Sequence, residues 1–259
     1  MPQTKSSYCE IVSSDLFRKG KIEAVYVIHA RQFTDRAAHI KAQLDAFEIP
    51  FEFIEPYDAE VLNPDIINRF YDFNDKESPG QKSCTLKHFE ALRKIAANEY
   101  CLALVLEDDA VLDRNFTKEL SKILDEARTL TPPYTIQIGS GGNMFVPKRR
   151  LKPGQRLYEA DQPRCTDSYL IGAQAARERL DWLEHNKIDR PTDHLFNLID
   201  RQKKIKAYWS DPAIVEQGSM NGLFSSALDD GRKDKPLWLV KLRFAWQRLR
   251  RKYIYRFFQ

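Results

Sequence analysis

The chain has 259 residues, of which 42% are hydrophobic and 30% are charged. This composition is typical of a folded globular protein with one large core, and it excludes a disordered chain. The four cysteines are scattered without a CxxC pair, so neither a zinc site nor a disulfide framework is predicted. The first twenty residues lack a hydrophobic leader and no apolar stretch approaches membrane-spanning length, so we expect a protein of the reducing cytoplasm.

Charge is distributed unevenly along the chain. The formal net charge is +4, but residues 235–259 contain eight Lys or Arg and no Asp or Glu, so subtracting those eight charges leaves −4 for the rest. We therefore expect three regions: an N-terminal arm over residues 1–20, one large domain over residues 21–234, and a basic, aromatic tail over residues 235–259.

The large domain begins with a strand, a helix and a second strand. Residues 22–30 are β-branched and apolar, which predicts a buried strand. Thr34 is expected to cap a helix over residues 35–47, in which apolar residues recur at helical spacing, and residues 51–54 predict the next strand. This order predicts a mostly parallel sheet with helices on both faces.

The rest of the domain continues the alternation after a polar, turn-rich segment at residues 63–80. Helices are predicted over residues 85–97, 116–130, 173–185 and 194–202, and strands over residues 101–106, 134–138, 169–172 and 205–209. Cys101 falls in one of these strands and is expected to be a small core residue. The pattern as a whole predicts a single α/β domain.

The strand predicted at residues 101–106 ends in three acids, Glu107, Asp108 and Asp109. Charges at the end of a buried strand need water, a hydrogen-bonding partner or a cation, and carboxylate oxygens suit Mg²⁺ and Mn²⁺. A divalent cation on a diphosphate is one interpretation, and a solvated turn is the other. If the chain stays extended, Glu107 and Asp109 point to the same side. Asp109 is then the expected direct ligand, with Glu107 or Asp108 as a second or water-mediated ligand.

Three segments, in order from about residue 22 to residue 220, form a further pattern. They are VYVIHARQFTDRAAHI with FEIPFEFIEPYDAE, then SPGQKSCTLKHFEALRKI with ALVLEDDAVL, and finally TDSYLIGAQAARERL with RPTDHLF and DPAIVEQGS. Their order and spacing resemble glycosyltransferase family 25, the bacterial lipopolysaccharide and lipooligosaccharide galactosyltransferases related to collagen galactosyltransferases. The chain departs from the family at His29 and Ala30, where Asn-Leu is usual, and before Cys84, where an acidic residue is usual.

The resemblance implies a Rossmann-like fold of the GT-A type, a UDP-sugar donor (most often UDP-galactose) and inversion at the sugar carbon. Mn²⁺ or Mg²⁺ held by Glu107 and Asp109 would then stabilise the charge that builds on the UDP leaving group. Asp193 matches a family motif and is the expected general base for the acceptor hydroxyl. Capping of the next helix by Thr192 or Asp193 is the alternative.

Further residues are expected to contact the nucleotide sugar. Asp35 and Arg36 match the family after the first strand, where a nucleotide meets the carboxyl edge of the sheet; compensation of a helix dipole is the alternative for Asp35. His88 could orient a phosphate or support the acidic strand, and a lone histidine on a helix is more often structural. Asp108 and Gln217 complete this set. Lesser candidates are Asp167 for a sugar or base contact, His194 as a third metal ligand, and Ser219 in the donor pocket.

The tail from Trp238 to Phe258 interleaves Lys and Arg with aromatic residues. Such a helix suits an anionic membrane surface, where each basic residue adds about 1 kcal/mol; a helix packed on the body is the alternative. Nucleic-acid binding is not expected, because the body is acidic and has no recognised module. We thus expect a peripheral enzyme at the inner face of the cytoplasmic membrane, acting on a lipid-linked saccharide. The alternatives are a catalytically silent nucleotide-binding relative and a peripheral membrane adaptor.

Overall fold

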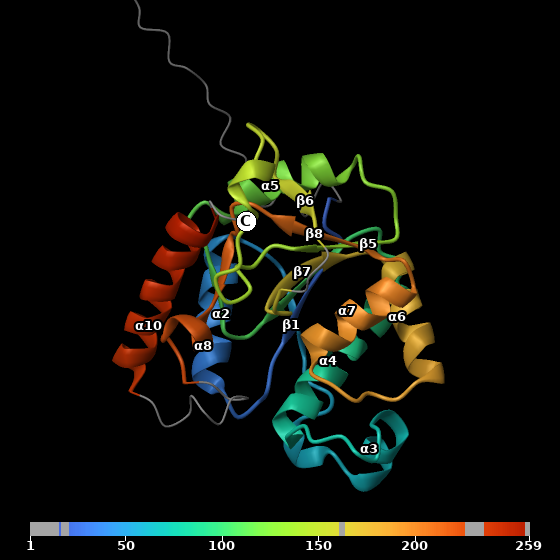
Figure 1. The fold of residues 1–259 in the computed structure, drawn as a ribbon. Coiled ribbons are helices and arrows are strands. Elements are labelled where there is room, and N and C mark those ends of the chain that lie inside the picture. Colours follow the sequence, from blue (N-terminus) through green and yellow to red (C-terminus); the bar gives the residue numbers. More distant parts are fainter. Residues whose placement is uncertain (1–15, 17–20, 161–163, 226–235, 257–259) are drawn as a thin grey trace, which may run out of the picture.

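The structure, a computed structural model, describes residue 16 and residues 21–160, 164–225 and 236–256, so the expected N-terminal arm lies outside it except for Leu16. Within these residues the centre is a seven-stranded sheet in the order β2-β1-β3-β7-β5-β8-β6 (Figure 1). Its strands are β1 (Ala24–Ile28), β2 (Glu52–Ile54), β3 (Ala103–Glu107), β5 (Tyr134–Gln137), β6 (Leu157–Glu159), β7 (Ser168–Ile171) and β8 (Lys206–Ser210). A second, two-stranded sheet pairs β4 (Ala110–Leu112) with β9 (Val215–Gln217).

Helices occupy most of the remaining described chain. They are α2 (Thr34–Ala46), α3 (Pro64–Phe70), α4 (Pro79–Ala97), α5 (Phe116–Ala127), α6 (Ala173–His185), α7 (Thr192–Gln202), α8 (Gly218–Asn221) and α10 (Leu237–Arg250). Short 3-10 turns occur at Ala59–Val61 and Lys148–Arg150, and a π-helical segment, Arg251–Tyr255, follows α10. No helix of the described residues has both the length and the apolar character needed to cross a membrane.

The central sheet is mixed, with one dominant direction. The pairs β2–β1, β1–β3 and β5–β8 are parallel, whereas β3–β7, β7–β5 and β8–β6 are antiparallel. Five strands of the described sheet therefore run one way, and only β6 and β7 run against them. The expected mostly parallel α/β sheet is confirmed. The reversal of β7 is what the sequence pattern did not predict.

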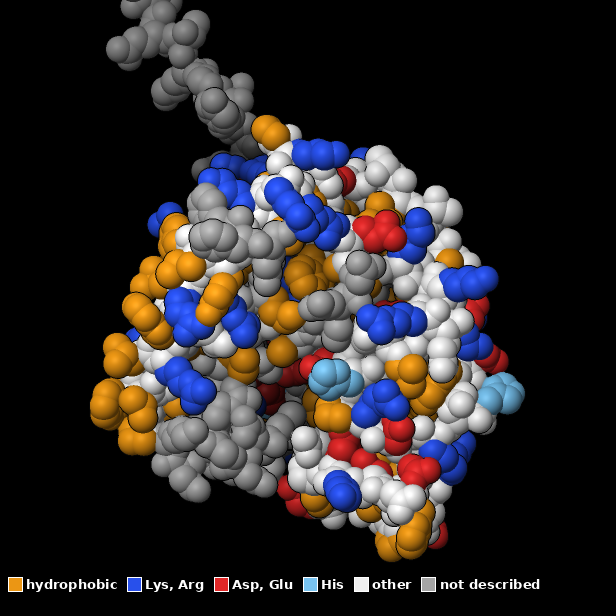
Figure 2. Space-filling model, viewed as in Figure 1, with side chains coloured by type: hydrophobic (Ala, Val, Ile, Leu, Met, Phe, Trp, Pro, Cys, Tyr) orange, Lys and Arg blue, Asp and Glu red, His pale blue; other side chains and the backbone are white. Residues whose placement is uncertain are grey.

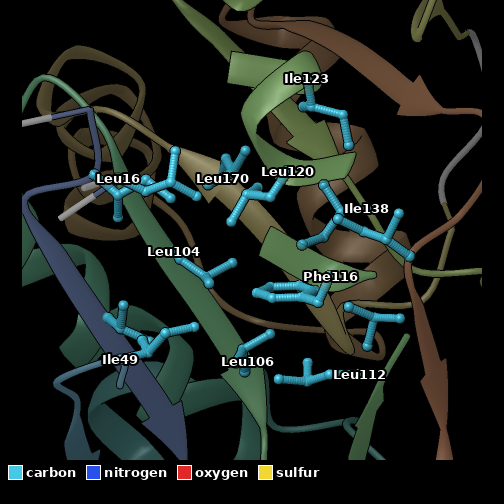
Figure 3. Close-up of a cluster of buried hydrophobic side chains, with 14 of the residues drawn as sticks. Leu16, Ile49, Leu104, Leu106, Leu112, Phe116, Leu120, Ile123, Ile138 and Leu170 are labelled. Carbon is cyan, nitrogen blue, oxygen red and sulfur yellow. The ribbon is translucent and has the colours of Figure 1, made fainter. Parts of the chain in front are cut away.

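Apolar side chains alternate along the strands and bury both faces of the sheet. Val25 and Val27 of β1 join one cluster, to which α2 and α5 contribute Leu44, Leu120 and others (Figure 3). Tyr26 of β1 faces the other way, into a cluster with α4, α6 and α7. Because successive side chains of a strand point to opposite faces, a continuous apolar run specifies a strand covered on both sides.

Several helices begin at residues other than those predicted from the sequence. The helix α2 starts at Thr34 itself, so the predicted cap by Thr34 is wrong; the N-cap position is Phe33 and has no side-chain cap. Residues 63–80 were expected to be irregular, yet α3 forms there behind the Asn63 cap. A proline in the first turn with a Ser or Asn cap starts a helix rather than a turn.

The start of α4 follows the same logic. It begins at Pro79, six residues before the predicted start, because Ser78 and Gln81 form a reciprocal capping box. Cys101 was expected in the core but is exposed, because β3 begins only at Ala103. The Cys101 amide instead meets the Glu23 carboxylate at the open end of the sheet.

The basic tail is helical over its described part. In Figure 1, α10 (red) runs along one side of the molecule beside α8, on the side opposite α6 and α7. The helix is held by contacts to the loop after β5: the Asn143 amide donates to the Phe244 carbonyl, and Arg251 donates to the Gly142 carbonyl at 2.9 Å. Phe244 is the buried residue of α10.

Candidate functional site

The acidic residues meet at one edge of the central sheet. Glu107 is the last residue of β3 and pairs with Ile28 at the end of the parallel strand β1. Because β7 is antiparallel to β3, its start lies at this same edge, and the Glu107 amide donates to the Asp167 carbonyl at 2.8 Å. The register of β9 on β4 places Gln217 opposite Ala110 and so brings it there as well.

Glu107 is held by several side chains. Its carboxylate accepts hydrogen bonds from the Thr166 hydroxyl and the Gln217 amide, both at 3.1 Å, and Nε2 of His88 lies 3.5 Å away. Burial by itself would raise the pKa of Glu107, but His88, Thr166 and Arg36 outweigh that effect and lower it. Glu107 is therefore a charged carboxylate inside the protein.

Of the two roles expected for His88, its contacts fit support of the acidic strand and not the orientation of a phosphate. The ring is fully buried, and its Nδ1 lies 3.1 Å from the Tyr169 hydroxyl. Its other nitrogen, Nε2, faces Glu107, so His88 on α4 supports the acidic end of β3. No described contact joins His88 to the open side of the site.

The Asp108 carboxylate is held apart from the other acids by two basic side chains, His29 and Arg36. Its carboxylate lies 2.9 Å from Nδ1 of His29 and 3.4 Å from the Arg36 guanidinium. Arg36 also donates to the Ser225 carbonyl at 2.6 Å and lies over the ring of Phe33. His29, a departure from the family pattern, is thus the hydrogen-bond partner of the middle acid.

Asp109 lies near Glu107, although the chain between them does not stay extended. The chain turns at Asp108 and Asp109, so the premise of an extended segment is wrong. One Asp109 oxygen accepts from the Ser219 amide at 2.9 Å, while Oδ1 is buried without a partner among the described residues. Burial and the nearby Glu107 raise the pKa of Asp109 to about 6.

Asp167 is the fourth acid of this edge. It is fully buried, and Oδ2 accepts from the Ser168 hydroxyl at 3.0 Å, whereas Oδ1 has no partner in the described chain. Burial and the charge of Glu107 raise the pKa of Asp167 well above its usual range. Two buried carboxylate oxygens, one on Asp109 and one on Asp167, are thus left without hydrogen bonds.

A cavity of about 160 Å³ opens beside Glu107. Asp193 and Gln217 line it together with Glu77 and Met220, so three of the predicted site residues share one space. Acidic side chains are visible inside the hollow near the middle of the face in Figure 2. The cavity joins residues from β3, β9 and the start of α7, which are far apart in the sequence.

Asp193 lies in the first turn of α7, at the mouth of this cavity. The helix starts at Thr192 behind Pro191, and neither Thr192 nor Asp193 occupies the cap position, so the capping interpretation is wrong. The Thr192 hydroxyl bonds to the Thr85 hydroxyl instead. Among the described residues, the Asp193 carboxylate accepts only from the next amide, that of His194, at 2.9 Å.

Two predicted residues, Asp35 and His194, are exposed and neither line the cavity nor contact the acids of the sheet edge among the described residues. Asp35 is exposed in the first turn of α2 and makes no hydrogen bond or ion pair with other described residues. His194 is exposed on α7, and no described contact links it to the acids. Asp35 therefore fits the helix-dipole interpretation better than a nucleotide contact.

Glu77 is a cavity residue that the sequence reading missed. Both of its carboxylate oxygens are buried without partners among the described residues. Burial, with a contribution from Asp75, raises its pKa to about 7. The residue precedes the capping box of α4 within a polar segment, and no spacing rule singles it out. Thr166 was missed for the same reason, since only the β3–β7 pairing brings it to Glu107.

The donor set at the sheet edge fits a hard divalent cation. Such ions take carboxylate oxygens, and Asp109 Oδ1 and Asp167 Oδ1 are buried oxygens that nothing in the described chain satisfies. A second group consists of Cys84, His88 and Glu107, whose ligand atoms lie within 4.8 Å of one another. Burial raises the pKa of the Cys84 thiol far above normal, which favours the protonated, poorly ligating form.

Comparison with known proteins matches this region to one family. Residues 22–140 match the family model of glycosyltransferase family 25, described as an LPS biosynthesis protein family. The chain is 24% identical to lipooligosaccharide biosynthesis protein Lic2B of Haemophilus influenzae over 161 residues, which are 59% of this chain and 60% of that protein. It is 23% identical to human procollagen galactosyltransferase 2 over 68% of this chain and 30% of that protein.

A third relative is the putative glycosyltransferase R655 of Acanthamoeba polyphaga mimivirus, 32% identical over 42% of this chain and 34% of that protein. The chain therefore spans less than two thirds of the length of each of these relatives. The matched residues contain β1, β3 and the acidic triplet, and the resemblance expected from the sequence motifs is confirmed. Residues 22–140 are thus similar to glycosyltransferase family 25.

Proposed function

We propose that the protein is an inverting glycosyltransferase that moves a sugar, galactose in the first instance, from a UDP-sugar to a lipopolysaccharide or lipooligosaccharide saccharide. The family match and the names of the relatives support the reaction class. The observation that carries the proposal is the shared cavity, which collects Glu107, Asp193 and Gln217 at the carboxyl edge of the sheet. In open α/β sheets this edge is where nucleotides bind.

The arrangement of the sheet is consistent with a GT-A-type domain, which we propose for residues 21–234. Glu107 and Asp109 would hold Mn²⁺ or Mg²⁺, with Asp167 close by. Bound there, the cation would act as a Lewis acid that stabilises negative charge on the diphosphate. Arg36 pairs with Asp108, which compensates the negative charge of that acid next to the same edge.

The residues of the chain would then perform an in-line displacement. A cavity carboxylate takes the proton of the acceptor hydroxyl, the hydroxyl oxygen bonds to the donor sugar carbon, and the bond from that carbon to UDP breaks. Asp193 is the base expected from the sequence, and its carboxylate lines the cavity. Glu77 is the second candidate, because its pKa of about 7 is matched to proton transfer near neutral pH.

A direct test uses the full chain with Mn²⁺ and a panel of UDP-sugars. The donor should raise the melting temperature only when the metal is present, because a ligand that binds the folded state stabilises it. UDP release in the presence of a lipooligosaccharide-derived oligosaccharide should follow. If UDP and Mn²⁺ bind but no acceptor or water promotes UDP release, the chain is a silent relative and the proposal fails.

The tail helix supports a membrane location. Trp238, Leu242, Trp246 and Leu249 are 53–68% exposed and share one face of α10 at helical spacing. This face is opposite the buried Phe244, so it is presented outward, and Figure 2 shows hydrophobic side chains along the same side of the molecule.

Basic residues border this apolar stripe. Lys241 and Arg243 flank it within α10, Lys252 follows it, and no acidic residue occurs in residues 235–259. We therefore propose that the occupant of the stripe is an anionic lipid surface, because an apolar face with cationic flanks inserts at the headgroup boundary. This location would bring the enzyme to a lipid-linked acceptor.

Vesicle sedimentation tests the membrane proposal. The protein should sediment with vesicles of phosphatidylcholine and phosphatidylglycerol and much less with phosphatidylcholine alone, and added salt should weaken the binding. Equal binding to both vesicles, or none, would contradict it. Concentration-dependent dimerisation that the substitution of Trp246 by Ser abolishes would instead assign the stripe to a second copy. If tail deletion abolishes function and Asp109→Ala has no effect, the adaptor interpretation is correct.

A further inference from the structure

A second and larger cavity, of about 690 Å³, lies between the tail and the body of the protein. Its lining includes three arginines and three aromatic residues: Arg149, Arg150, Arg251, Phe145, Trp209 and Tyr255. They come from the loop after β5, from β8 and from the π-helical segment of the tail. All of these residues lie outside residues 22–140, which match the family.

The cavity carries a strongly positive lining. None of the described residues that line it is acidic. Arg149 makes no hydrogen bond or ion pair within the described chain, and Arg251 uses one nitrogen on the Gly142 carbonyl. Guanidinium groups present a planar fork of donors that matches the oxygens of a phosphate. The lining thus suits an anion of phosphate type.

The remaining surface suits a sugar ring next to that anion. Two of the residues that line the cavity, Trp209 and Asn143, are more than nine-tenths buried. Nε1 of Trp209 and Oδ1 of Asn143 have no hydrogen-bond partner among the described residues. Aromatic faces pack on the C–H faces of a sugar, and an unpaired donor and acceptor can meet hydroxyl groups.

This larger cavity is a neighbour of the cavity beside Glu107 (the acidic cavity), because the loop after β5 lines the larger cavity and packs against Met220 of the acidic one. A side-chain carbon on Gly139 would lie 2.0 Å from Oδ2 of Asp167, and one on Gly142 would lie 2.7 Å from Met220, which lines the acidic cavity. Asn143, one residue further along, lines the larger cavity. Four residues of chain span at most about 14 Å, so the two spaces are within reach of one oligosaccharide.

A single buried arginine fixes this dividing loop. Arg164 donates to the Gly139 carbonyl at 2.8 Å and to the Met144 carbonyl at 2.9 Å, and its guanidinium lies 4.4 Å from the centre of the Trp209 ring. The loop that separates the cavities is thus held at both ends by one side chain. The larger cavity is therefore preformed, which lowers the entropic cost of binding.

We propose that the larger cavity binds a phosphorylated saccharide, as the subsite for the anionic part of the acceptor. The inference rests on the proposed glycosyltransfer for its biological meaning, but not for the binding itself. The arginines hold the phosphate and the aromatic residues hold the sugar ring. The acceptor hydroxyl then extends past the Gly139–Gly142 loop to the acidic cavity.

Calorimetric titration of the full chain tests the binding. Glucose 6-phosphate should bind more tightly than glucose, inorganic phosphate or glycerol 3-phosphate, the last of which imitates a phospholipid headgroup. The double variant Arg149→Gln/Arg150→Gln should weaken that binding by at least about tenfold, since each hydrogen bond to a charged group is worth about a factor of ten. Trp209→Phe, which keeps a ring but removes the N–H, should weaken it less. Arg128→Gln, at the exposed arginine that follows α5 as its C-cap, is the matched control and should leave binding unchanged.

Three outcomes would overturn the inference. Equal binding of inorganic phosphate would reduce the site to a general anion site, and equal binding of glycerol 3-phosphate would assign it to lipid headgroups. Unchanged affinity in the folded double-arginine variant would remove the arginines from the site. Circular dichroism of each variant establishes that it is folded.

Kinetics separate this inference from the proposed function. With a phosphorylated oligosaccharide acceptor, the double variant should raise the acceptor KM and leave the UDP-sugar KM unchanged; with the dephosphorylated acceptor it should behave like wild type. If wild type turns over no acceptor but binds glucose 6-phosphate through these arginines, the proposed function fails and the subsite stands. If turnover is normal and the variant changes no acceptor KM, the subsite fails and the proposed function stands.

Discussion

The acidic edge of the sheet and the surface of α10 place their charges in opposite ways. At the edge, Glu107, Asp109 and Asp167 are packed together inside the protein, where each charge needs a partner. Along α10, cationic and aromatic side chains are exposed, and an exposed charge contributes little until a partner arrives. The fold itself therefore positions the acids of the sheet edge, whereas the exposed residues of α10 contribute energy only when a binding partner contacts them.

The largest expected effect is on the acidic edge. Asp109→Asn should lower the rate of UDP release by about a hundredfold or more, because it removes a charge aimed at the leaving group. The melting temperature should change little, since Asn has the same shape and the carboxylate has only one hydrogen-bond partner. Asp125→Asn, an exposed acid on α5, is the control. Turnover like that of wild type in Asp109→Asn would contradict the proposed role of the Asp109 charge.

Burial, and not charge alone, should decide the cost of losing an ion pair. Arg179 and Asp200 form a buried pair with two hydrogen bonds of 2.8 Å between α6 and α7. Arg179→Ala should lower the free energy of unfolding by about 3–5 kcal/mol, because it leaves a buried carboxylate unpaired. Arg177→Ala breaks an exposed pair with Glu99 and should cost about 0–1 kcal/mol. Urea denaturation measures both, and equal losses would contradict the argument.

The exposed stripe should matter for binding and not for folding. Trp246→Ser should weaken binding to anionic vesicles by about tenfold, since a tryptophan buries a large apolar area at a membrane surface. Its melting temperature should match wild type, because Trp246 is 62% exposed. Phe73→Ser is the matched control: this phenylalanine is fully exposed but lies outside the tail. A similar loss in both variants would show that general hydrophobicity, not the stripe, drives binding.

The smallest expected effect is a pH dependence from Glu77. Its pKa is raised from 4.5 to about 7, so between these values the folded state holds a proton that the unfolded state has released. The free energy of unfolding should therefore fall as pH rises through this window, and Glu77→Gln should remove that slope. If Glu77 is the base, activity should also rise as pH passes about 7, and Glu77→Gln should lose this rise in the pH–activity profile. If Asp193 is the base, Asp193→Asn should abolish activity, and Glu77→Gln should keep the pH–activity profile of wild type.

The strands and helices of the core were largely predictable, because their apolar periodicity matches the elements that bury it. The strand at Ala24–Ile28 and the helix at Ala173–His185 follow directly from such runs. Elements with weak periodicity were not predictable: α3 depends on the Asn63 cap, and β9 on pairing with a distant strand. The reversal of β7 likewise depends on tertiary pairing, which no local pattern encodes.

The candidate site was predictable only as far as its charges were unusual in sequence. Glu107 and Asp109 stand out because they end an apolar run, and Gln217 because of a family resemblance. Glu77 lies in an ordinary polar segment, and its environment exists only after α4 and α7 have packed around it. The arginine-lined cavity was hidden for the same reason, since its tail and its loop lie about a hundred residues apart.

The dividing loop also limits how the chain can vary. Gly139 has the Asp167 carboxylate where any other residue would need its first side-chain carbon. A saturation library at this position should return glycine alone among active clones, since even alanine would displace Asp167, an acid of the proposed reaction centre. We then expect acceptor choice to diverge among related chains through substitutions at Phe145, Arg149 and the tail, while the fixed backbone between the two cavities stays the same.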